Sequence, residues 1–170
     1  VLQLPYSGAP STVAAIRHGA LASQTNYTLR HLIEDVCQEL RGKDYVSEAL
    51  AWLHFVEART RYMRDPRTIE LVRAPYLIAQ EIAAGRIPSI DCDCGVALVT
   101  AGTLMSGAES VVITYAFKHM FYAGDRQYSH VAAGVIEPRS GALVVLDPVA
   151  GKDTKSMLDR AVAAKIWPIA

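Results

Sequence analysis

The sequence predicts an α+β fold in which helices come first and strands follow. Apolar side chains recur at helical spacing in two segments before residue 65, and a further apolar helix is expected to end at Gly107. After Gly107 the pattern becomes extended, with β-branched and aromatic residues over Ser110–Phe117. Runs of helices followed by runs of strands are typical of the α+β class. The chain of 170 residues is long enough for a single domain over residues 1–170.

Four helices are predicted in the N-terminal helical part, at about residues 1–84. Proline, glycine and an acidic cap mark their ends, and the last of them is expected to bury the flank of the central helix. Their expected ranges are Thr12–Ser23, 26–42 closed by Gly42, 44–64 after a cap at Asp44, and Pro75–Ala84.

The functional prediction rests on Ile90–Gly107. From Val96 onward the side chains are small or apolar until Gly107, which predicts a buried helix closed by a glycine in the left-handed conformation. Cys92 falls at or just before the start of this helix. Backbone N–H groups and the positive end of the helix dipole converge there, so a thiolate is stabilised and an oxyanion can be held. Cys92 is therefore a candidate catalytic nucleophile.

Three other interpretations of this cysteine remain open. Cys92 could be a small buried hydrophobe, as many unpaired cysteines are. With Cys94, Asp91 and Asp93 it could bind a soft metal, although structural zinc usually needs a second cysteine or histidine pair, which this chain lacks. A disulfide between Cys92 and Cys94 would close a very short, strained loop. We predict no metal site and no cofactor.

A β-hairpin is expected after the first strand. Its strands are predicted at Gln127–Glu137 and Ala142–Leu146, joined by a turn at Pro138–Gly141. If Glu137 faces Ala142, the same register places Asp147 opposite Ala132. His130, two residues from Ala132, then projects from the same face as Asp147 as its diagonal neighbour. A slip of one residue would place the two side chains on opposite faces.

Cys92, His130 and Asp147 together have the residue types of a thiol nucleophile, a base and an orienting carboxylate. The imidazole would take the thiol proton and return it to a leaving amine, while the carboxylate fixes the imidazole tautomer. Two alternatives remain: His130 could be a surface residue, with Asp147 in a simple turn, or His119 could be the base.

Charge and cysteine content predict the class of partner and the compartment. Seventeen basic residues balance seventeen acidic ones, so we expect no nucleic-acid partner. Three cysteines are too few for a disulfide framework and favour a reducing, cytoplasmic location. The N-terminus has no basic lead and is interrupted by Pro5, so no signal peptide is expected. The apolar run over Gly95–Phe117 contains Glu109, which favours a buried helix and strand over a membrane span.

The motifs together resemble the transglutaminase-like cysteine peptidase superfamily, especially its bacterial and phage-associated branch. The resemblance covers roughly residues 60–150 and has two departures, Cys94 in place of a second aspartate and Gly95 in place of a bulky residue. The motifs that carry it are Tyr62-Met63-Arg64-Asp65-Pro66, Gly85, Asp91-Cys92-Asp93-Cys94, Gly107, His130-Val131 and Leu146-Asp147-Pro148.

This resemblance implies a papain-like, transglutaminase-like core at about residues 85–150. A central nucleophile helix would pack on an antiparallel sheet, and a C-terminal helix would follow at about 154–165, capped by Asp153 or Thr154. The family's nucleophile, base and acid fall on Cys92, His130 and Asp147. The implied chemistry is acyl transfer through a thioester that water or another amine resolves.

Two functions follow as expectations. The first is a cysteine peptidase or amidase that acts on a peptide, an isopeptide or a peptidoglycan-stem amide, with hydrolysis as the default. The second is a catalytically silent phage structural or assembly protein with the same fold. Substrate, oligomeric state and the choice between hydrolysis and transamidation stay open at this stage.

Overall fold

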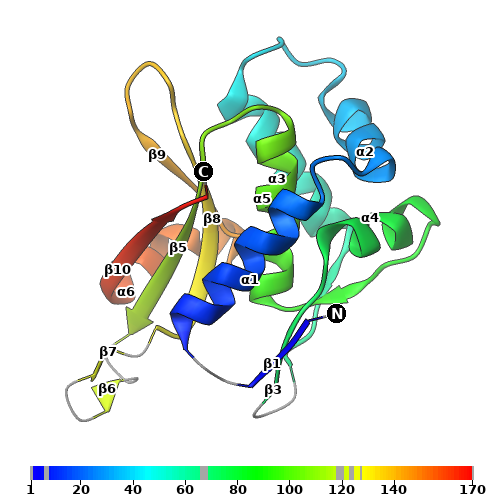
Figure 1. Ribbon diagram of the computed structural model, residues 1–170. Helices are drawn as coiled ribbons and strands as arrows, with labels where there is room; N and C mark the ends of the chain where they lie inside the picture. Colours follow the sequence, from blue (N-terminus) through cyan, green and yellow to red (C-terminus); the bar gives the residue numbers. More distant parts are fainter. Residues whose placement is uncertain are drawn as a thin grey trace.

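The protein has an α+β fold, described by a computed structural model over residues 2–5, 8–65, 69–117, 121–122, 125–126 and 128–169. The helices of the N-terminal half and the central helix gather on one side of a four-stranded antiparallel sheet (Figure 1). One apolar core joins these helices to the sheet face that they cover. No helix in the described ranges is long and apolar enough to cross a bilayer.

Four helices precede the central one, as predicted. Asn26 and Asp44 cap two of them, accepting hydrogen bonds from Leu29 N–H (3.0 Å) and Ser47 N–H (3.2 Å). Their bounds are α1 Ala9–Ala22, α2 Tyr27–Cys37, α3 Tyr45–Arg59 and α4 Pro75–Ala83.

Two predicted helix ends are wrong. Helix α2 ends at Cys37, well before Gly42, and Lys43 rather than Gly42 has positive φ (67°) in the connection. Helix α3 ends at Arg59 rather than near residue 64, because Thr60 is extended and the chain then enters a strand.

Among the described residues, three short strand pairs lie outside the main sheet, and sequence reasoning assigned no pairing to their strands. They are β1 Leu2–Pro5 with β3 Ile69–Val72, antiparallel; β2 Arg61–Tyr62 with β4 Ser89–Ile90, parallel; and β6 Phe121–Tyr122 with β7 Asp125–Arg126, antiparallel.

The central helix α5, Cys92–Met105, lies between α1 and α3 and packs on the sheet (Figure 1). Its side chains are buried from Asp93 to Thr103. Trp52 of α3 donates from Nε1 to the Leu98 carbonyl at 3.2 Å and lies against Gly102, where a Cβ would be 2.1 Å from that nitrogen. Gly107 follows the helix with φ 89°, which confirms the predicted left-handed glycine.

The main sheet has the strand order β10-β5-β8-β9. Ala133 pairs with Leu146, and Glu137 N–H donates to the Ala142 carbonyl at 2.8 Å, so the predicted hairpin register is confirmed. The strands are β5 Ser110–Phe117, β8 His130–Ile136, β9 Leu143–Leu146 and β10 Ala161–Pro168.

The predicted C-terminal helix at 154–165 is too long. A 3₁₀ turn, η2 Gly151–Asp153, leads into α6 Thr154–Arg160, and the chain then becomes strand β10. Pairing with β5 outweighs the helix propensity of its alanines, because the ladder continues from Ala161 to Pro168. Trp167 adds a side-chain hydrogen bond from Nε1 to Thr114 Oγ1 (2.9 Å).

Candidate active site

Cys92 is the first residue of α5 and is half-buried. Asp91 precedes it as an extended N-cap, and its Oδ1 accepts a hydrogen bond from Cys94 N–H at 3.1 Å. The helical ladder begins at Gly95, whose N–H donates to the Asp91 carbonyl at 3.0 Å. The thiol therefore lies at the positive end of a buried helix, as predicted.

Cys94 has different surroundings. It is 2% exposed, and its Sγ donates to the Leu71 carbonyl (3.0 Å) and accepts from Arg73 N–H (3.2 Å). Burial, followed by the charges of Asp91 and Asp93, raises the pKa of this thiol far above its ordinary value. Only the thiolate is a strong nucleophile, and the raised pKa keeps Cys94 in the thiol form. Its hydrogen bonds instead connect α5 to β3 and to the residue that follows that strand.

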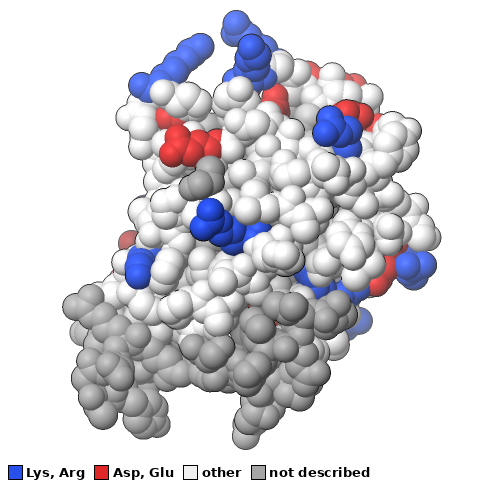
Figure 2. Space-filling view, in the orientation of Figure 1, with Lys and Arg blue, Asp and Glu red and all other residues white. Residues whose placement is uncertain are grey.

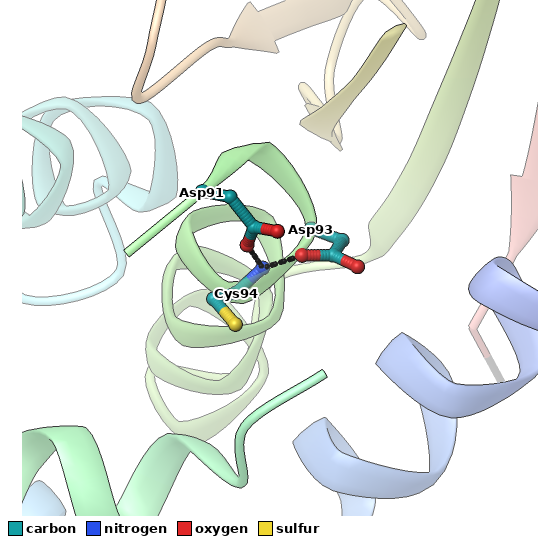
Figure 3. Close-up of side chains that lie close together, drawn as sticks. All are labelled: Asp91, Asp93 and Cys94. Atoms are coloured by element: carbon teal, nitrogen blue, oxygen red, sulfur yellow. Dashed lines mark hydrogen bonds between the residues drawn. The ribbon is translucent and has the colours of Figure 1, made fainter. Parts of the chain in front are cut away.

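The carboxylates of Asp91 and Asp93 and the Cys94 sulfur lie within 4.8 Å of one another (Figure 3). These are the residues of the metal-binding interpretation. Oδ1 of each carboxylate accepts a hydrogen bond from the same Cys94 N–H, at 3.1 Å and 2.7 Å, and the sulfur is hydrogen-bonded to the backbone. The group thus acts as a helix cap.

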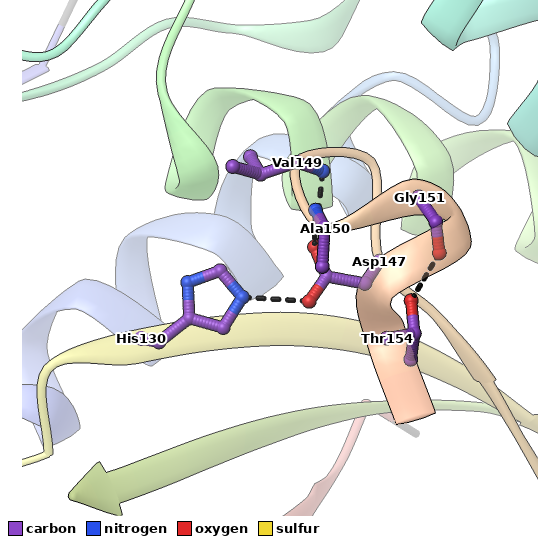
Figure 4. A network of polar contacts seen from close by, with 6 residues as sticks. All are labelled: His130, Asp147, Val149, Ala150, Gly151 and Thr154. Carbon is purple, nitrogen blue, oxygen red and sulfur yellow. Dashed lines mark hydrogen bonds and ion pairs between the residues drawn. The ribbon is translucent and has the colours of Figure 1, made fainter. Parts of the chain in front are cut away.

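His130 and Asp147 are in direct contact (Figure 4). His130 Nε2 is 2.7 Å from Asp147 Oδ2, and the two side chains are 10% and 1% exposed. The N–H groups of Val149 (3.0 Å) and Ala150 (2.9 Å) donate to the other carboxylate oxygen, Oδ1. The backbone after β9 therefore fixes the Asp147 carboxylate, and the carboxylate fixes the orientation of the imidazole. The other ring nitrogen, Nδ1, points away from Asp147.

Packing brings the first turn of α5 against the segment that carries Asp147. A Cβ built at Gly95 would lie 3.0 Å from Pro148 Cγ and 3.3 Å from Ile90 Cδ1. Cys92 lies three residues before Gly95 and therefore on the same helix face, about 5–6 Å away along it. Gly95 is thus a position where the first turn of α5 and the segment after β9 lie in close contact.

Two tyrosines join this region, and sequence reasoning missed both. Tyr115 pairs with His130 across β5 and β8, and the two rings are stacked with centroids 6.1 Å apart. Burial and then the charge of Asp147 raise the pKa of Tyr115 to about 12. Burial and then a Cys92 thiolate raise the pKa of Tyr62. Strand pairing could have identified Tyr115, whereas Tyr62 stood in a motif of the resemblance to which sequence reasoning assigned no role at the site.

The other candidate base, His119, lies outside the described residues. Charged side chains are spread over the face shown in Figure 2, with broad uncharged areas between them.

A solved structure shares this fold. It is a crystal structure described as a putative protease from Parabacteroides distasonis, with a TM-score of 0.57 and 11% sequence identity. The likeness is one of fold alone. It covers 80% of the present chain but 26% of the other, so this chain spans about a quarter of that protein's length. No protein family and no curated protein matches the sequence.

Proposed function

We propose that this protein is a cysteine peptidase or amidase of the transglutaminase-like kind, in which Cys92 is the nucleophile, His130 the base and Asp147 the orienting acid. The observation that carries the proposal is the 2.7 Å contact between His130 Nε2 and Asp147 Oδ2. This buried pair lies on the hairpin whose Pro148 abuts the first turn of the Cys92 helix. The protease-like description of the structural neighbour agrees with this class of reaction.

The proposed reaction begins when His130 Nδ1 takes the thiol proton of Cys92. The thiolate attacks the amide carbonyl, a carbon–sulfur bond forms, and backbone N–H groups at the start of α5 stabilise the oxyanion. The carbon–nitrogen bond then breaks, and the imidazolium returns its proton to the leaving amine. Water, deprotonated by the same imidazole, resolves the thioester to a carboxylate and restores the thiol.

Asp147 has two roles in this scheme. Asp147 accepts a hydrogen bond from Nε2–H and so keeps the neutral imidazole in the tautomer whose Nδ1 can accept the thiol proton. The charge of the carboxylate then stabilises the imidazolium that forms. Asp91 and Asp93 are also negative and lie beside Cys92. A thiolate there needs a positive partner to offset their charge, and the imidazolium supplies it.

The test is the pH dependence of iodoacetamide alkylation at each cysteine, followed by peptide mass spectrometry in the parent and in His130→Ala. We expect Cys92 to react fast below the ordinary thiol pKa of about 8.5, because the ion pair holds it as thiolate. His130→Ala should slow alkylation at pH 7 about tenfold or more, as expected when the thiol pKa rises by one unit or more. Cys94 should stay unreactive in both folded proteins.

Asp147→Asn is the companion variant, because it keeps the shape of the acid and removes its charge. A Cys92 that titrates as an ordinary thiol in the parent, with no change in His130→Ala, would contradict the proposal. That result would favour the catalytically silent assembly protein instead.

A further inference from the structure

We propose that Arg73 positions the nucleophile by holding the chain on both sides of Cys92. The inference rests on the proposed function and adds a positioning residue to it. Arg73 lies directly after β3, and its backbone and side chain contact three different elements, α5, β4 and α4.

The contacts of Arg73 reach the chain before and after the nucleophile. Nη1 of its guanidinium donates to the Ser89 carbonyl in β4 at 3.3 Å, and Ser89 lies three residues before Cys92. The backbone N–H of Arg73 donates to Cys94 Sγ at 3.2 Å, and Cys94 lies two residues after Cys92. A single residue therefore holds both the strand that leads into α5 and the first turn of that helix.

The segment before Cys92 is hydrogen-bonded along both of its edges. On one edge, the carbonyls of Pro88 and Ile90 accept from N–H groups of β2 at 3.0 and 2.8 Å. In a parallel ladder, the residue between two such acceptors directs its carbonyl to the opposite edge. Ser89 has this position, and the guanidinium of Arg73 meets its carbonyl there. The arginine thus takes the place of a neighbouring strand and limits the movement of β4.

Glu81 of α4 fixes the guanidinium. Its carboxylate forms an ion pair with Nη2 of Arg73, and the two side chains are 28% and 22% exposed. A planar guanidinium can bind a carbonyl and a carboxylate at once in fixed directions, whereas the ammonium of lysine is a point charge. A partly exposed ion pair adds little to the free energy of unfolding. We therefore expect its loss to affect the position of Cys92 more than the stability of the fold.

The experiment measures iodoacetamide alkylation of Cys92 as a function of pH. It gives two quantities, the pH of the half-maximal rate and the maximal rate of the thiolate. If Arg73 positions Cys92 against His130, its loss weakens the pair of thiolate and imidazolium and raises the pH of the half-maximal rate. The maximal rate should stay the same, because a small reagent needs no bound geometry.

Two substitutions of Arg73 test the guanidinium. Arg73→Met keeps the backbone N–H and the apolar stem, and we expect it to slow alkylation at pH 7 about tenfold, which corresponds to a shift of about one pH unit. Arg73→Lys keeps the charge but cannot bind both partners in the same way. It should slow alkylation about threefold, or about half a pH unit.

Glu81→Gln distinguishes positioning from a simple effect of charge. If charge alone mattered, removing a carboxylate would lower the pH of the half-maximal rate, because the thiolate is then less disfavoured. If Glu81 acts by holding Arg73, the same variant raises this pH, and alkylation at pH 7 slows about threefold. Glu34→Gln is the matched control, because it makes the same chemical change at the exposed contact between His31 and Glu34 (3.8 Å). It should leave both quantities unchanged.

A double variant tests whether Arg73 acts through His130. In His130→Ala the imidazole is already absent, so the addition of Arg73→Met should change the alkylation profile no further. Urea unfolding of each variant establishes that folded proteins are compared. Should Arg73→Met fail to fold, Arg73→Lys and Glu81→Gln carry the test.

Two results would overturn the inference. If alkylation of the parent depends on His130 but Glu81→Gln lowers the pH of the half-maximal rate or leaves it unchanged, Arg73 does not position Cys92 and the proposed function stands. The same conclusion follows if Arg73→Met slows alkylation equally with and without His130. If Cys92 shows no reactivity that depends on His130, the proposed function fails, and the positioning role of Arg73 fails with it.

Discussion

Cys92 and Cys94 lie two residues apart on one helix, yet their environments differ in every respect that affects a thiol. Cys92 is half-buried at the positive end of α5. Cys94 is buried, hydrogen-bonded on both sides and close to two carboxylates that disfavour its ionised form. Residue type alone does not distinguish the two, whereas position within the first helical turn does.

Tyr115 provides a prediction at the residue scale. Its ring stacks on His130, and its hydroxyl is buried with no hydrogen-bond partner among the described residues. Tyr115→Phe should keep the ring contact and leave the free energy of unfolding equal or higher by up to about 1 kcal/mol, because an unsatisfied hydroxyl is removed. Tyr115→Leu should lower it by about 1–3 kcal/mol, because the stacked ring is lost.

Urea unfolding and Cys92 alkylation at pH 7 measure the two effects together. We expect slower alkylation in Tyr115→Leu than in Tyr115→Phe, because the imidazole is then less well positioned. Equal alkylation rates in both variants would show that Tyr115 does not position His130.

At the scale of elements, the candidate site depends on how closely α5 approaches the hairpin. Gly95 permits that approach, because any side chain there would contact Pro148. The hairpin brings His130 and Asp147 together, and the helix supplies Cys92. The geometry of the three therefore depends on a packing contact as well as on hydrogen bonds.

Gly95→Ala tests this contact. The new methyl group would lie 3.0 Å from Pro148 Cγ, so the turn that fixes Asp147 must move by a few tenths of an ångström. We expect Cys92 alkylation at pH 7 to slow about tenfold or less, since misplacement by a full ångström can cost about a hundredfold. Folding should be retained, because alanine improves helix propensity by about 1 kcal/mol.

Gly42→Ala is the matched control, because a Cβ there meets nothing within 4 Å. An unchanged alkylation rate in Gly95→Ala would show that the distance between helix and hairpin does not limit the reactivity of Cys92.

The elements also show what the sequence could predict. The register of β8 and β9 was predictable, because a short turn and the alternation of apolar residues specify a hairpin. The start of α5 was predictable from Asp91, whose side chain caps it. Strand β10 was not, because its alanines favour a helix and its partner β5 lies about fifty residues away. The contact between Gly95 and Pro148 was not predictable either, because it also joins residues about fifty positions apart in the chain.

At the scale of the whole molecule, the buried thiol of Cys94 should couple folding to pH. The pKa of this thiol in the folded protein lies above its ordinary value of about 8.5, so above that pH the thiol ionises in the unfolded chain while it stays neutral in the folded one. The free energy of unfolding should then fall by about 1.4 kcal/mol per pH unit, and its full value should be present below about pH 8.5.

Urea unfolding under reducing conditions, between about pH 7.5 and pH 10.5, measures this slope. Cys94→Ala should be less stable at neutral pH, since two hydrogen bonds are lost, but its stability should decline less above pH 9. Parallel declines in the two proteins would show that Cys94 ionises equally in both states.

The position of β10 at the edge of the sheet affects the order in which the molecule is built. During synthesis, Cys92, His130 and Asp147 all emerge from the ribosome before residue 150, and β8 is then available to pair with one side of β5. The other side of β5 stays open until residues 161–168 emerge. For that interval the nascent chain exposes a long apolar strand edge, which is a template for aggregation. The last strand therefore covers this edge of β5 only after every residue of the candidate site has been synthesised.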